Sequence, residues 1–356
     1  MNLDSLLPNL GEWLRGSGPD SDVVVSTRIR LARNLADFPF TGRATPAQKA
    51  EIVTRARDAI ARAELPGKLE YHDVPSMATL DRQFLVERQL ISRELAAVLE
   101  GPRGVAFDAK ESVSVMVNEE DHLRLQVLRS GFALEEAWAD VDKLDDAIEA
   151  RLVYAFHAQF GYLTACPTNV GTGLRASVML HLPALGLTKQ IDKVFRALQK
   201  INLAVRGLHG EGSRAFGDLY QISNQVTLGK PETKILNEIK EVIVTILQYE
   251  RQARAVLLKE RKQGEHDRVA RALGTLGSAT MITTEETMEL LSVVRLGIHL
   301  QLINDVPATV VNQLFIQTQA AHLQKLVGHA LDGEERNAAR AKYLKTRLRE
   351  LGAHRQ

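Results

Sequence analysis

The sequence predicts an α+β fold that continues into an all-helical C-terminal region. Up to about residue 260, short segments alternate apolar and polar residues with a period of two, which is typical of half-buried strands, and amphipathic segments separate them. From His266 onward no such alternation recurs. We therefore expect an N-terminal segment and linker over residues 1–20, a mixed domain over residues 21–260 and a helical domain over residues 261–356.

The composition is that of an ordinary globular protein. The chain has 356 residues, of which 45% are hydrophobic and 25% are charged, and its net charge is +1. Such a charge gives no general attraction to nucleic acids or membranes, so neither is expected as a partner. The single cysteine excludes a disulfide framework and a cysteine-based metal cluster. With no secretion signal and no apolar run near the ~20 residues that span a bilayer, we expect a cytoplasmic protein.

Two early segments are predicted strands that carry polar residues of interest. Residues 23–31 are rich in β-branched residues, and period two places Arg28 and Arg30 on one face. Residues 112–117 and 123–127 form a hairpin whose tip, residues 118–122, holds three acids and a histidine. The arginines could simply lie on a solvated face, and the acids could serve solubility alone.

Several helices are expected between and after these strands. Thr45 and Gln48 form a capping box, with Pro46 at the first helical position, so a helix begins there and ends near residue 63. The other predicted helices cover residues 83–99, 134–156, 191–201 and 231–264. Beyond residue 264 we expect several helices broken at Gly274, Gly277, Pro307 and Gly333.

The central segment, residues 165–183, is a glycine-punctuated loop that runs into a strand. Its Gly171-x-Gly173-x-x-Ala176 pattern resembles a dinucleotide fingerprint, but that motif must open a helix. The residues that follow alternate instead, with one face formed by Ala176, Val178, Leu180 and Leu182 and the other by Arg175, Ser177, Met179 and His181. We therefore reject the dinucleotide-binding interpretation and predict a half-buried strand.

Five arginines are predicted on strand faces or at strand ends: Arg28, Arg30, Arg124, Arg175 and Arg206. A guanidinium group matches phosphate oxygens with two parallel donors and stays charged. The chain has no phosphate-binding loop of the Walker type, so a triphosphate would need such a substitute. The sequence alone does not show that the five converge. Glycines 207, 210, 212 and 217 predict a mobile loop after the last arginine.

Four motifs resemble the phosphagen (guanidino) kinases, which transfer the γ-phosphoryl group of ATP to a guanidinium group. In chain order they are Ser26-Thr27-Arg28-Ile29-Arg30, residues 118–124 (N-E-E-D-H-L-R), residues 166–175 (C-P-T-N-V-G-T-G-L-R) and residues 206–211 (R-G-L-H-G-E). The resemblance covers about residues 21–255 and implies a large antiparallel sheet flanked by helices.

The resemblance also implies roles for individual residues. Glu120 and Glu211 would orient the guanidinium and accept its proton, with Cys166 beside it. The residues expected to bind ATP are Ser26, Thr27, Arg28, Ile29, Arg30, Gln89, Arg124, Arg175, Ala176, Ser177, Val178, Met179, Arg206, Gly207, Leu208, His209 and Gly210. Mg²⁺ would be held mainly by the nucleotide rather than by the protein. A small buried core residue is the alternative for Cys166.

The order of the regions resembles the bacterial protein-arginine kinases rather than the metabolic arginine kinases. The metabolic enzymes carry a helical domain before the first motif, whereas here only residues 1–25 precede Ser26 and a helical region follows the catalytic part. The resemblance implies phosphorylation of exposed protein arginines in protein quality control under stress, marking substrates for a Clp protease. The alternatives are a free-arginine phosphagen kinase and a non-catalytic phosphoarginine-binding adaptor.

Two departures from the family pattern bear on these expectations. The R-D-x-x-R-A motif implicated in phosphoarginine binding and regulation appears here as Arg336-Asn337-Ala338-Ala339-Arg340-Ala341, so Asn337 replaces an acid. Gln89 stands where relatives often place a histidine near the adenine, and we expect altered nucleotide affinity. The resemblance further implies a homodimer, an activator protein and a Clp ATPase as partners. As an alternative to a regulatory role, Arg336 and Arg340 could lie at the exposed start of a terminal helix.

Overall fold

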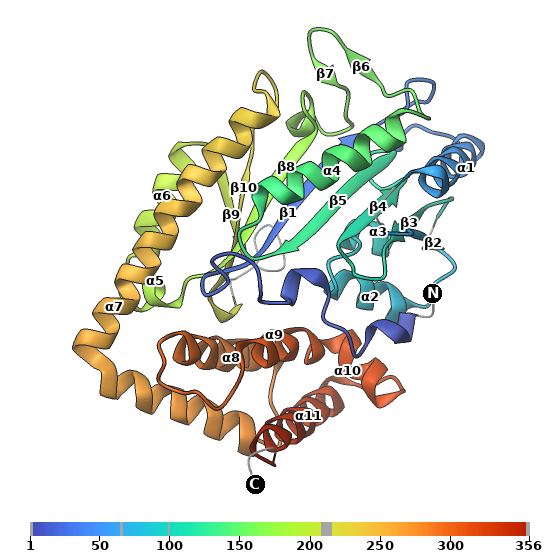
Figure 1. Cartoon of the computed structure of the whole chain (residues 1–356). Helices are drawn as coiled ribbons and strands as arrows, with labels where there is room; N and C mark the ends of the chain where they lie inside the picture. The colour runs from blue at the N-terminus through green and yellow to red at the C-terminus, as the bar shows by residue number, and fades with distance from the viewer. Residues whose placement is uncertain (1–2, 65–66, 99, 208–215, 354–356) are drawn as a thin grey trace.

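The computed structural model describes residues 3–64, 67–98, 100–207 and 216–353. Its centre is an eight-stranded sheet in which all neighbouring strands pair antiparallel, in the order β2-β3-β4-β5-β1-β8-β10-β9 (Figure 1). The strands are β1 (Val24–Arg33), β2 (Glu70–Asp73), β3 (Gly104–Phe107), β4 (Val113–Val117), β5 (Leu123–Ser130), β8 (Leu174–His181), β9 (Leu203–Gly207) and β10 (Leu219–Asn224). The α+β prediction with a large antiparallel sheet is confirmed.

The central strand β1 holds the sheet together because it pairs with β5 on one side and β8 on the other. Its register places Arg28 beside Ser177 and Arg30 beside Arg175. On the other side Arg30 lies beside Gln126. Because side chains alternate between the two faces of a sheet, this register gathers polar residues of three strands on one face.

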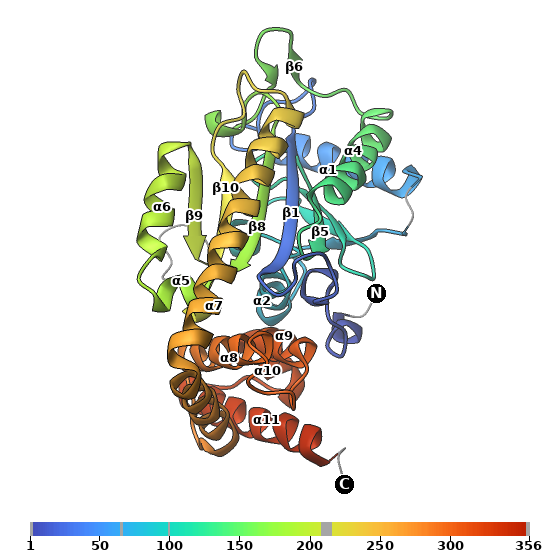
Figure 2. The ribbon, with the colours of Figure 1, turned by 60° about the vertical axis from the view of Figure 1, so that its left-hand side comes forward.

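The opposite face of the sheet is apolar and carries the main core. Ile29, Leu125 and Val178 are among its fully buried residues, and they pack against helices on that face. The helices that contribute buried residues there are α1 (Pro46–Arg62), α4 (Leu134–Glu149), α5 (Pro183–Leu187), α6 (Ile191–Lys200) and the first half of α7 (Glu232–Ser278). Figure 2 shows α7 running alongside the strands and then turning beneath them.

The helices confirm some predicted boundaries and correct others. The capping box at Thr45 forms as expected, and α1 ends one residue before its cap, Ala63. The helix predicted over residues 83–99 is two helices, α2 (Thr79–Glu87) and α3 (Arg93–Ala97), because Gln89 adopts a left-handed backbone with φ +63 and Ser92 caps the second. The helix α4 ends at Glu149, seven residues before the predicted end at residue 156.

The long helix α7 passes the glycines at which we expected it to break. It has 47 residues and one non-helical residue, Arg261, with φ −137 and ψ 21. Gly274 and Gly277 lie inside it, so the breaks predicted there are wrong, whereas Pro307 caps α9 and Gly333 begins α11. The bend at Arg261 falls at the domain boundary that the sequence predicts, and that division stays a prediction.

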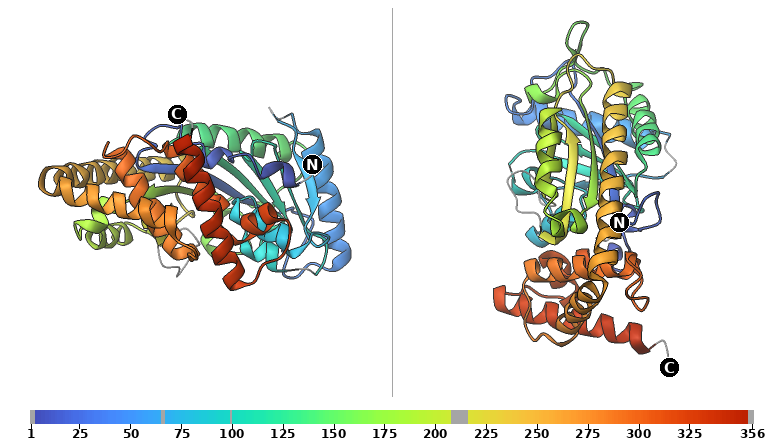
Figure 3. Two further views of the ribbon diagram at one scale, coloured as in Figure 1. Left: turned by 90° about the horizontal axis from the view of Figure 1, so that it is seen from below. Right: turned by 90° about the vertical axis from the view of Figure 1, so that its left-hand side faces the viewer.

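The C-terminal helices lie at one end of the sheet (Figure 3). They are α8 (Thr284–His299), α9 (Ala308–Gln317), α10 (Ala320–Val327) and α11 (Gly333–Ala353). Their apolar faces form a second core with Val25 of β1, Met179 of β8 and Leu219 of β10. The helical region is therefore packed directly on the strands. None of the helices in the described ranges is long and apolar enough to cross a membrane.

The N-terminal segment is more ordered than a linker. It forms two 3₁₀ turns, η1 (Leu3–Leu6) and η2 (Glu12–Leu14). Trp13 and Leu14 are buried in the second core. Gly18 approaches the sheet so closely that an added Cβ would lie 1.8 Å from the carbonyl oxygen of Ser130. This segment therefore packs directly against the end of β5.

A short two-stranded hairpin and two 3₁₀ turns complete the described fold. The strands β6 (Phe156–His157) and β7 (Gly161–Tyr162) form a separate two-stranded hairpin. The 3₁₀ turn η3 (Pro167–Asn169) follows Cys166, and η4 (Phe216–Asp218) precedes β10.

Candidate active site

A cleft of about 1400 Å³ opens on the polar face of the sheet. All five arginines singled out in the sequence line it: Arg28, Arg30, Arg124, Arg175 and Arg206. They come from four strands, β1, β5, β8 and β9, and the sheet register brings them to one face. The convergence that the sequence alone left open is therefore present. Such a concentration of guanidinium groups suits a polyanion.

Arg28 is held by neutral partners. Its two terminal nitrogens donate to the amide oxygens of Gln89 (2.9 Å) and Gln221 (2.8 Å). Burial lowers the pKa of Arg28 to about 10, and repulsion from other cleft arginines adds to the fall. The same causes place the pKa of Arg30 well below its ordinary value. The contribution of the neighbouring arginines to both pKa shifts reflects crowded positive charge, which a bound anion would relieve.

The hairpin tip supplies carboxylates beside Arg124. The guanidinium of Arg124 donates to Glu119 at 2.7 Å and to Glu120 at 3.4 Å. Glu119 is buried and also accepts from the hydroxyl of Ser92, whereas Glu120 is exposed. Partial burial raises the pKa of the Glu120 carboxyl, Arg124 opposes the rise, and the neighbouring acids Asp121, Glu119 and Glu94 add to it. Of the two glutamates, Glu120 is therefore the one available to a ligand.

A buried aspartate ties the hairpin tip to the cysteine loop. Asp121 accepts from the side chain of Asn34 and from the backbone N–H of Ala165, both at 2.7 Å. His122 accepts the backbone N–H of Leu35 at Nδ1 and therefore donates from Nε2 to a carbonyl oxygen. These contacts fix the positions of Glu120 and Cys166 relative to each other.

Cys166 lies at the cleft surface rather than in the core. Its side chain is half-buried, lines the cleft and contacts the hydroxyl of Thr168, with 3.0 Å between Sγ and Oγ1. The alternative of a buried core cysteine is therefore wrong. The loop that follows needs glycine: Gly173 has φ +66, and a Cβ there would lie 2.6 Å from the carbonyl oxygen of Ala32.

Gln89 reaches the cleft because the helix is broken at that point. Its backbone carbonyl accepts from the side chain of Gln126 at 2.7 Å, and its side chain accepts from Arg28. The preceding residue, Arg88, is fully buried and forms an ion pair with Glu111. This pair anchors the break, so Gln89 has a defined place in the cleft wall.

Not every residue expected to bind ATP has its side chain in the cleft. Period two sends Ile29, Ala176 and Val178 to the opposite face, where they are fully buried in the main core. Thr27 also points away and donates to the carbonyl oxygen of Gly131 at 2.7 Å. The side chains of these four residues are therefore outside the cleft, and their part in ATP binding stays a prediction. Ser26, Ser177 and Met179 line a small recess beside Arg28.

Part of the fourth motif lies outside the described residues. Gly207 ends β9 and is buried, whereas Leu208, His209, Gly210 and Glu211 belong to the range that the structure does not describe, as do Gly212 and most of the predicted mobile loop. The expected roles of these residues therefore stay predictions.

Three residues that contribute to the cleft were missed by the sequence reasoning. Glu119 sits inside a recognised motif, but the resemblance singled out only Glu120, and its burial beside Arg124 is a tertiary feature. Asp121 is in the same motif. Gln221 follows the alternation of its strand, which was the one signal in the sequence that could have pointed to it.

The C-terminal motif is built into the helical core more deeply than an exposed helix start would be. Arg340 is 1% exposed and donates to the carbonyl oxygens of Thr318 (2.8 Å) and Ile282 (2.9 Å) and to the side chain of Asn337 (2.8 Å). Burial lowers its pKa. Arg336 is half-buried and donates to Leu331, and the buried side chain of Ala341 packs in the second core. The side chain of Ala341 is therefore not exposed to a ligand, and the predicted regulatory role of this residue stays a prediction.

Metal ligands are sparse in the part of the chain that the structure describes. Among residues 3–64, 67–98, 100–207 and 216–353, no group of three or more His, Cys, Asp or Glu side chains could hold a metal ion. The cleft instead presents arginines with Glu119 and Glu120 nearby. The expectation that Mg²⁺ would be held mainly by the nucleotide stays a prediction.

Comparison with known proteins shows first the class. Residues 51–253 match the model for the ATP:guanido phosphotransferase C-terminal catalytic domain. A duplicated taurocyamine kinase from Schistosoma mansoni with bound transition-state-analogue components has a TM-score of 0.60 and 27% identity, covering 69% of this chain and 35% of that chain. A lombricine kinase, 24% identical with a TM-score of 0.59, covers 71% of this chain and 77% of its own and shares the fold.

Comparison with curated relatives then defines the family. Residues 262–356 match the model for the protein-arginine kinase McsB C-terminal domain. The protein-arginine kinase of Halothermothrix orenii is 48% identical over 349 residues, 98% of this chain and 99% of the relative. That of Symbiobacterium thermophilum is 46% identical over 339 residues, 94% and 96%. The chain belongs to the protein-arginine kinase family of guanidino phosphotransferases, and its phosphoryl donor is ATP.

Proposed function

We propose that this chain transfers the γ-phosphoryl group of MgATP to the guanidinium group of arginine side chains in proteins, with Arg28, Arg30, Arg124, Arg175 and Arg206 on the phosphates and Glu120 on the acceptor. The observation that carries the proposal is the convergence of the five arginines, Glu120 and Cys166 in one cleft. Transfer of a phosphoryl group asks mainly for in-line positioning and charge neutralisation. The five arginines would neutralise the phosphate charge, and Glu120 would position the acceptor.

The arginines neutralise the nucleotide. Each presents a planar set of donors that fits two phosphate oxygens, and burial between a sheet and helices strengthens the attraction. The lowered pKa of Arg28, about 10, still leaves it charged at neutral pH. Mg²⁺ would be held by phosphate oxygens and water and would neutralise further charge between the terminal phosphates.

The acceptor nitrogen must lose a proton before it becomes nucleophilic. A guanidinium has a pKa above ~12, so a positioned carboxylate has to orient it and take the proton during transfer. Glu120 is exposed to the cleft, and its raised pKa makes it a better proton acceptor than an ordinary glutamate. Glu211 stays the second predicted carboxylate. Cys166 would lie beside the guanidinium and favour its position.

Two observations favour a protein acceptor over free arginine. The relatives named protein-arginine kinases match this chain over nearly its whole length. The helical region after the kinase part matches the C-terminal model of that family. A free-arginine phosphagen kinase is therefore the weaker alternative. The cleft, with its arginines and Glu120, argues against a purely non-catalytic adaptor.

We further propose the biological setting that the family resemblance implies. Phosphorylated proteins would be marked for degradation by a Clp protease, with an activator protein and a Clp ATPase as partners and a homodimer as the assembly. Arg336, Asn337 and Arg340 would take part in phosphoarginine sensing. The free donor capacity for that role is greater at half-buried Arg336 than at Arg340, whose guanidinium already binds three oxygens. The cytoplasmic location stays a prediction.

The direct test offers two acceptors to one enzyme. The chain is incubated with Mg²⁺ and γ-labelled ATP together with either free L-arginine or an arginine-rich unfolded protein, and acid-labile phosphate is measured on each. Label on the protein but not on the amino acid supports the proposal. Label on free arginine would identify a phosphagen kinase instead. If neither is labelled, the assay is repeated with cell extract, and continued absence of label leaves the adaptor.

A further inference from the structure

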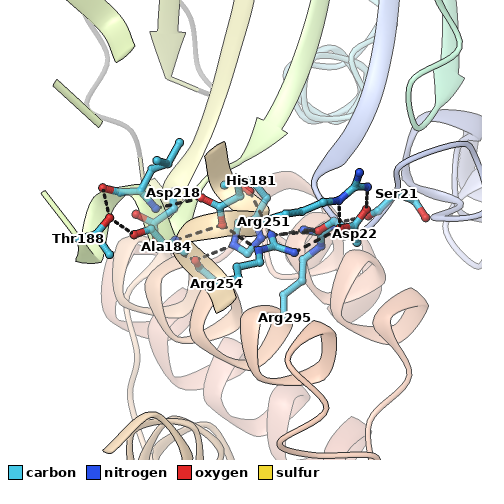
Figure 4. Close-up of polar contacts among 12 residues, drawn as sticks. Ser21, Asp22, His181, Ala184, Thr188, Asp218, Arg251, Arg254 and Arg295 are labelled. Atoms are coloured by element: carbon cyan, nitrogen blue, oxygen red, sulfur yellow. Dashed lines mark hydrogen bonds and ion pairs between the residues drawn. The ribbon is translucent and has the colours of Figure 1, made fainter. Parts of the chain in front are cut away.

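The ends of three neighbouring strands lie against the helix α8 (Figure 4). The first end is marked by Asp22, two positions before β1 begins. The second is His181, the last residue of β8, and the third is Asp218, directly before β10. The three strands are adjacent in the sheet. All three ends are bound by two side chains of α8, Arg295 and Ser292.

Arg295 binds two of the three ends directly. Its guanidinium donates to the carbonyl oxygens of Ser21 (2.6 Å) and Asp22 (3.3 Å), and to Nδ1 of His181 (2.8 Å). The side chain is 1% exposed. A buried guanidinium in this position is costly unless its donors are used, so its contacts fix the spacing between β1 and β8.

A chain of hydrogen bonds then joins the second end to the third. Because Nδ1 of His181 accepts from Arg295, its Nε2 carries the hydrogen and donates to the hydroxyl of Ser292 at 2.9 Å. Ser292 in turn donates to the carboxylate of Asp218 at 2.9 Å. Burial and the neighbouring arginines hold the pKa of His181 well below its ordinary value, so the ring stays neutral and the direction of the chain is fixed.

A second arginine, Arg254 of α7, also binds these strand ends. We call the contacts of Arg295, Ser292 and Arg254 with the strand ends the joint. Arg254 donates to Glu250 at 2.8 Å and to the carbonyl oxygen of Asp22 at 3.2 Å. Glu250 also accepts the backbone N–H groups of Ala184 and Leu185, which follow β8. Both helices that meet at the joint therefore bind the same strand ends.

The strands held at this joint are the ones that carry much of the cleft. β1 carries Arg28 and Arg30, β8 carries Arg175, and β10 carries Gln221, which binds Arg28. A shift of one strand along its neighbour would move these groups together, since hydrogen-bonded strands share one register. Misplacement by about 1 Å far from the reacting atoms can lower a rate roughly a hundredfold.

We propose that α8 is a positioning element for phosphoryl transfer, in which Arg295 and Ser292 hold the ends of β1, β8 and β10 so that their arginines meet the phosphates. This inference rests on the proposed function of the cleft. It makes the helical region part of the catalytic apparatus, in addition to any role in recognition. Ser292 and Arg295 are positioning residues, since neither lines the cleft in the described part of the chain.

The test replaces one hydroxyl and measures turnover, nucleotide affinity and stability together. Ser292→Ala breaks the bonds from His181 and to Asp218 while removing a single oxygen atom. We expect kcat for protein phosphorylation to fall roughly tenfold to a hundredfold, with weaker ADP binding by calorimetry and a cooperative thermal transition retained. Asp218→Asn keeps an oxygen that can accept from Ser292, so this variant should retain most of the wild-type kcat.

The matched control is Ser278→Ala, at the exposed end of α7, whose hydroxyl bonds only within its own helix. It should leave every readout unchanged. The proposal is overturned if Ser292→Ala matches the wild type in kcat and ADP affinity, or if its loss of activity equals its loss of folded protein. If the wild-type chain itself does not phosphorylate protein, the proposed function is wrong. The positioning role is then tested by ADP affinity alone, and an unchanged affinity in Ser292→Ala would overturn it.

Discussion

Two sets of arginines lie close to the same strands: the five half-buried arginines of the cleft, and the buried Arg254 and Arg295 of α7 and α8 at the strand ends. In the cleft, the charges that shift the pKa of Arg28 are all other arginines, Arg124, Arg175 and Arg206. At the joint with α8, Arg295 is surrounded by carbonyl oxygens and an imidazole, and the acids Asp22 and Glu250 offset the repulsion from Arg254. The cleft thus carries an excess of positive charge, whereas the joint is nearly balanced within the chain.

The difference separates a binding role from a structural one. Crowding like charges costs free energy in the folded protein, and only an anion from outside can recover it. A balanced and hydrogen-bonded group needs no ligand and restrains its neighbours instead. A lowered pKa alone does not tell the two apart, because the pKa values of Arg28 and Arg295 are both lowered, to about 10 and about 9. The charges of the neighbours decide.

The largest effect is expected at the acceptor end of the cleft. Glu120→Ala removes the carboxylate that would orient the guanidinium and accept its proton, and general base catalysis contributes about 10²–10⁴-fold. Phosphoryl transfer should therefore fall about a thousandfold or more while ADP still binds. Single-turnover phosphorylation measures the rate of transfer, and calorimetry measures ADP binding. Glu94→Ala, at another acid that lines the cleft, should retain most activity; full activity in Glu120→Ala would exclude this mechanism.

Two arginines of β5 test the phosphate role with the strand held constant. Arg124 faces the cleft, and Arg129 lies on the other face, paired with Asp140. Arg124→Met should lower kcat/KM for ATP by about a hundredfold, as loss of one charge-stabilising donor typically does. Arg129→Met should leave kcat/KM nearly unchanged, although it loses an ion pair. Equal losses in both variants would mean that the sheet, and not the cleft charge, was disturbed.

The C-terminal arginines extend the comparison to the helical region. Arg340→Ala removes three hydrogen bonds from a buried guanidinium and should destabilise the fold by about 2–3 kcal/mol. Arg336→Ala removes one bond to a carbonyl and should cost less than about 1 kcal/mol. Chemical denaturation measures both, and phosphoarginine binding is titrated alongside. A larger stability loss from Arg336→Ala would reverse the assignment of the structural arginine. If the Arg336→Ala, Arg340→Ala double variant keeps both phosphoarginine binding and its oligomeric state, the regulatory role falls.

Cys166 should contribute a smaller share. Its thiol contacts Thr168, a contact that a serine hydroxyl can also make, so Cys166→Ser should keep the loop in place. We expect kcat to fall by less than about tenfold, equivalent to about 1.4 kcal/mol of transition-state stabilisation. Steady-state kinetics on an arginine-rich protein measures this. Complete loss of turnover in a folded Cys166→Ser variant would make the thiol essential.

The smallest expected effect is a displacement of the acid limb of the pH profile. The charge of Glu119 raises the pKa of Glu120, while Arg124 lowers it. Glu119→Gln removes the first influence and frees Arg124 to act more strongly, so the pKa of Glu120 should fall. A general base works in its deprotonated form, and the acid limb of kcat/KM should therefore move to lower pH. A limb that stays in place would show that Glu120 does not govern it.

How much the sequence could predict depends on the range of the interactions involved. Period-two alternation predicted that Arg28 and Arg30 share a face, because the signal lies within one strand. The break at Gln89 was missed, since it depends on the buried ion pair between Arg88 and Glu111. The role of Gln221 follows from the register of β10 on β8, which the sequence does not contain. The joint at α8 escaped prediction for the same reason: Ser292 and His181 are 111 positions apart.

The most direct test of the central claim examines the bond that the cleft makes. After incubation of the chain with MgATP and an arginine-rich protein, phosphorus NMR of the protein product distinguishes a phosphorus–nitrogen bond from a phosphate ester. The account predicts a phosphorus–nitrogen signal on protein that acid removes and that Glu120→Ala fails to produce. An acid-stable ester, or an equal phosphorus–nitrogen signal from Glu120→Ala, would contradict it.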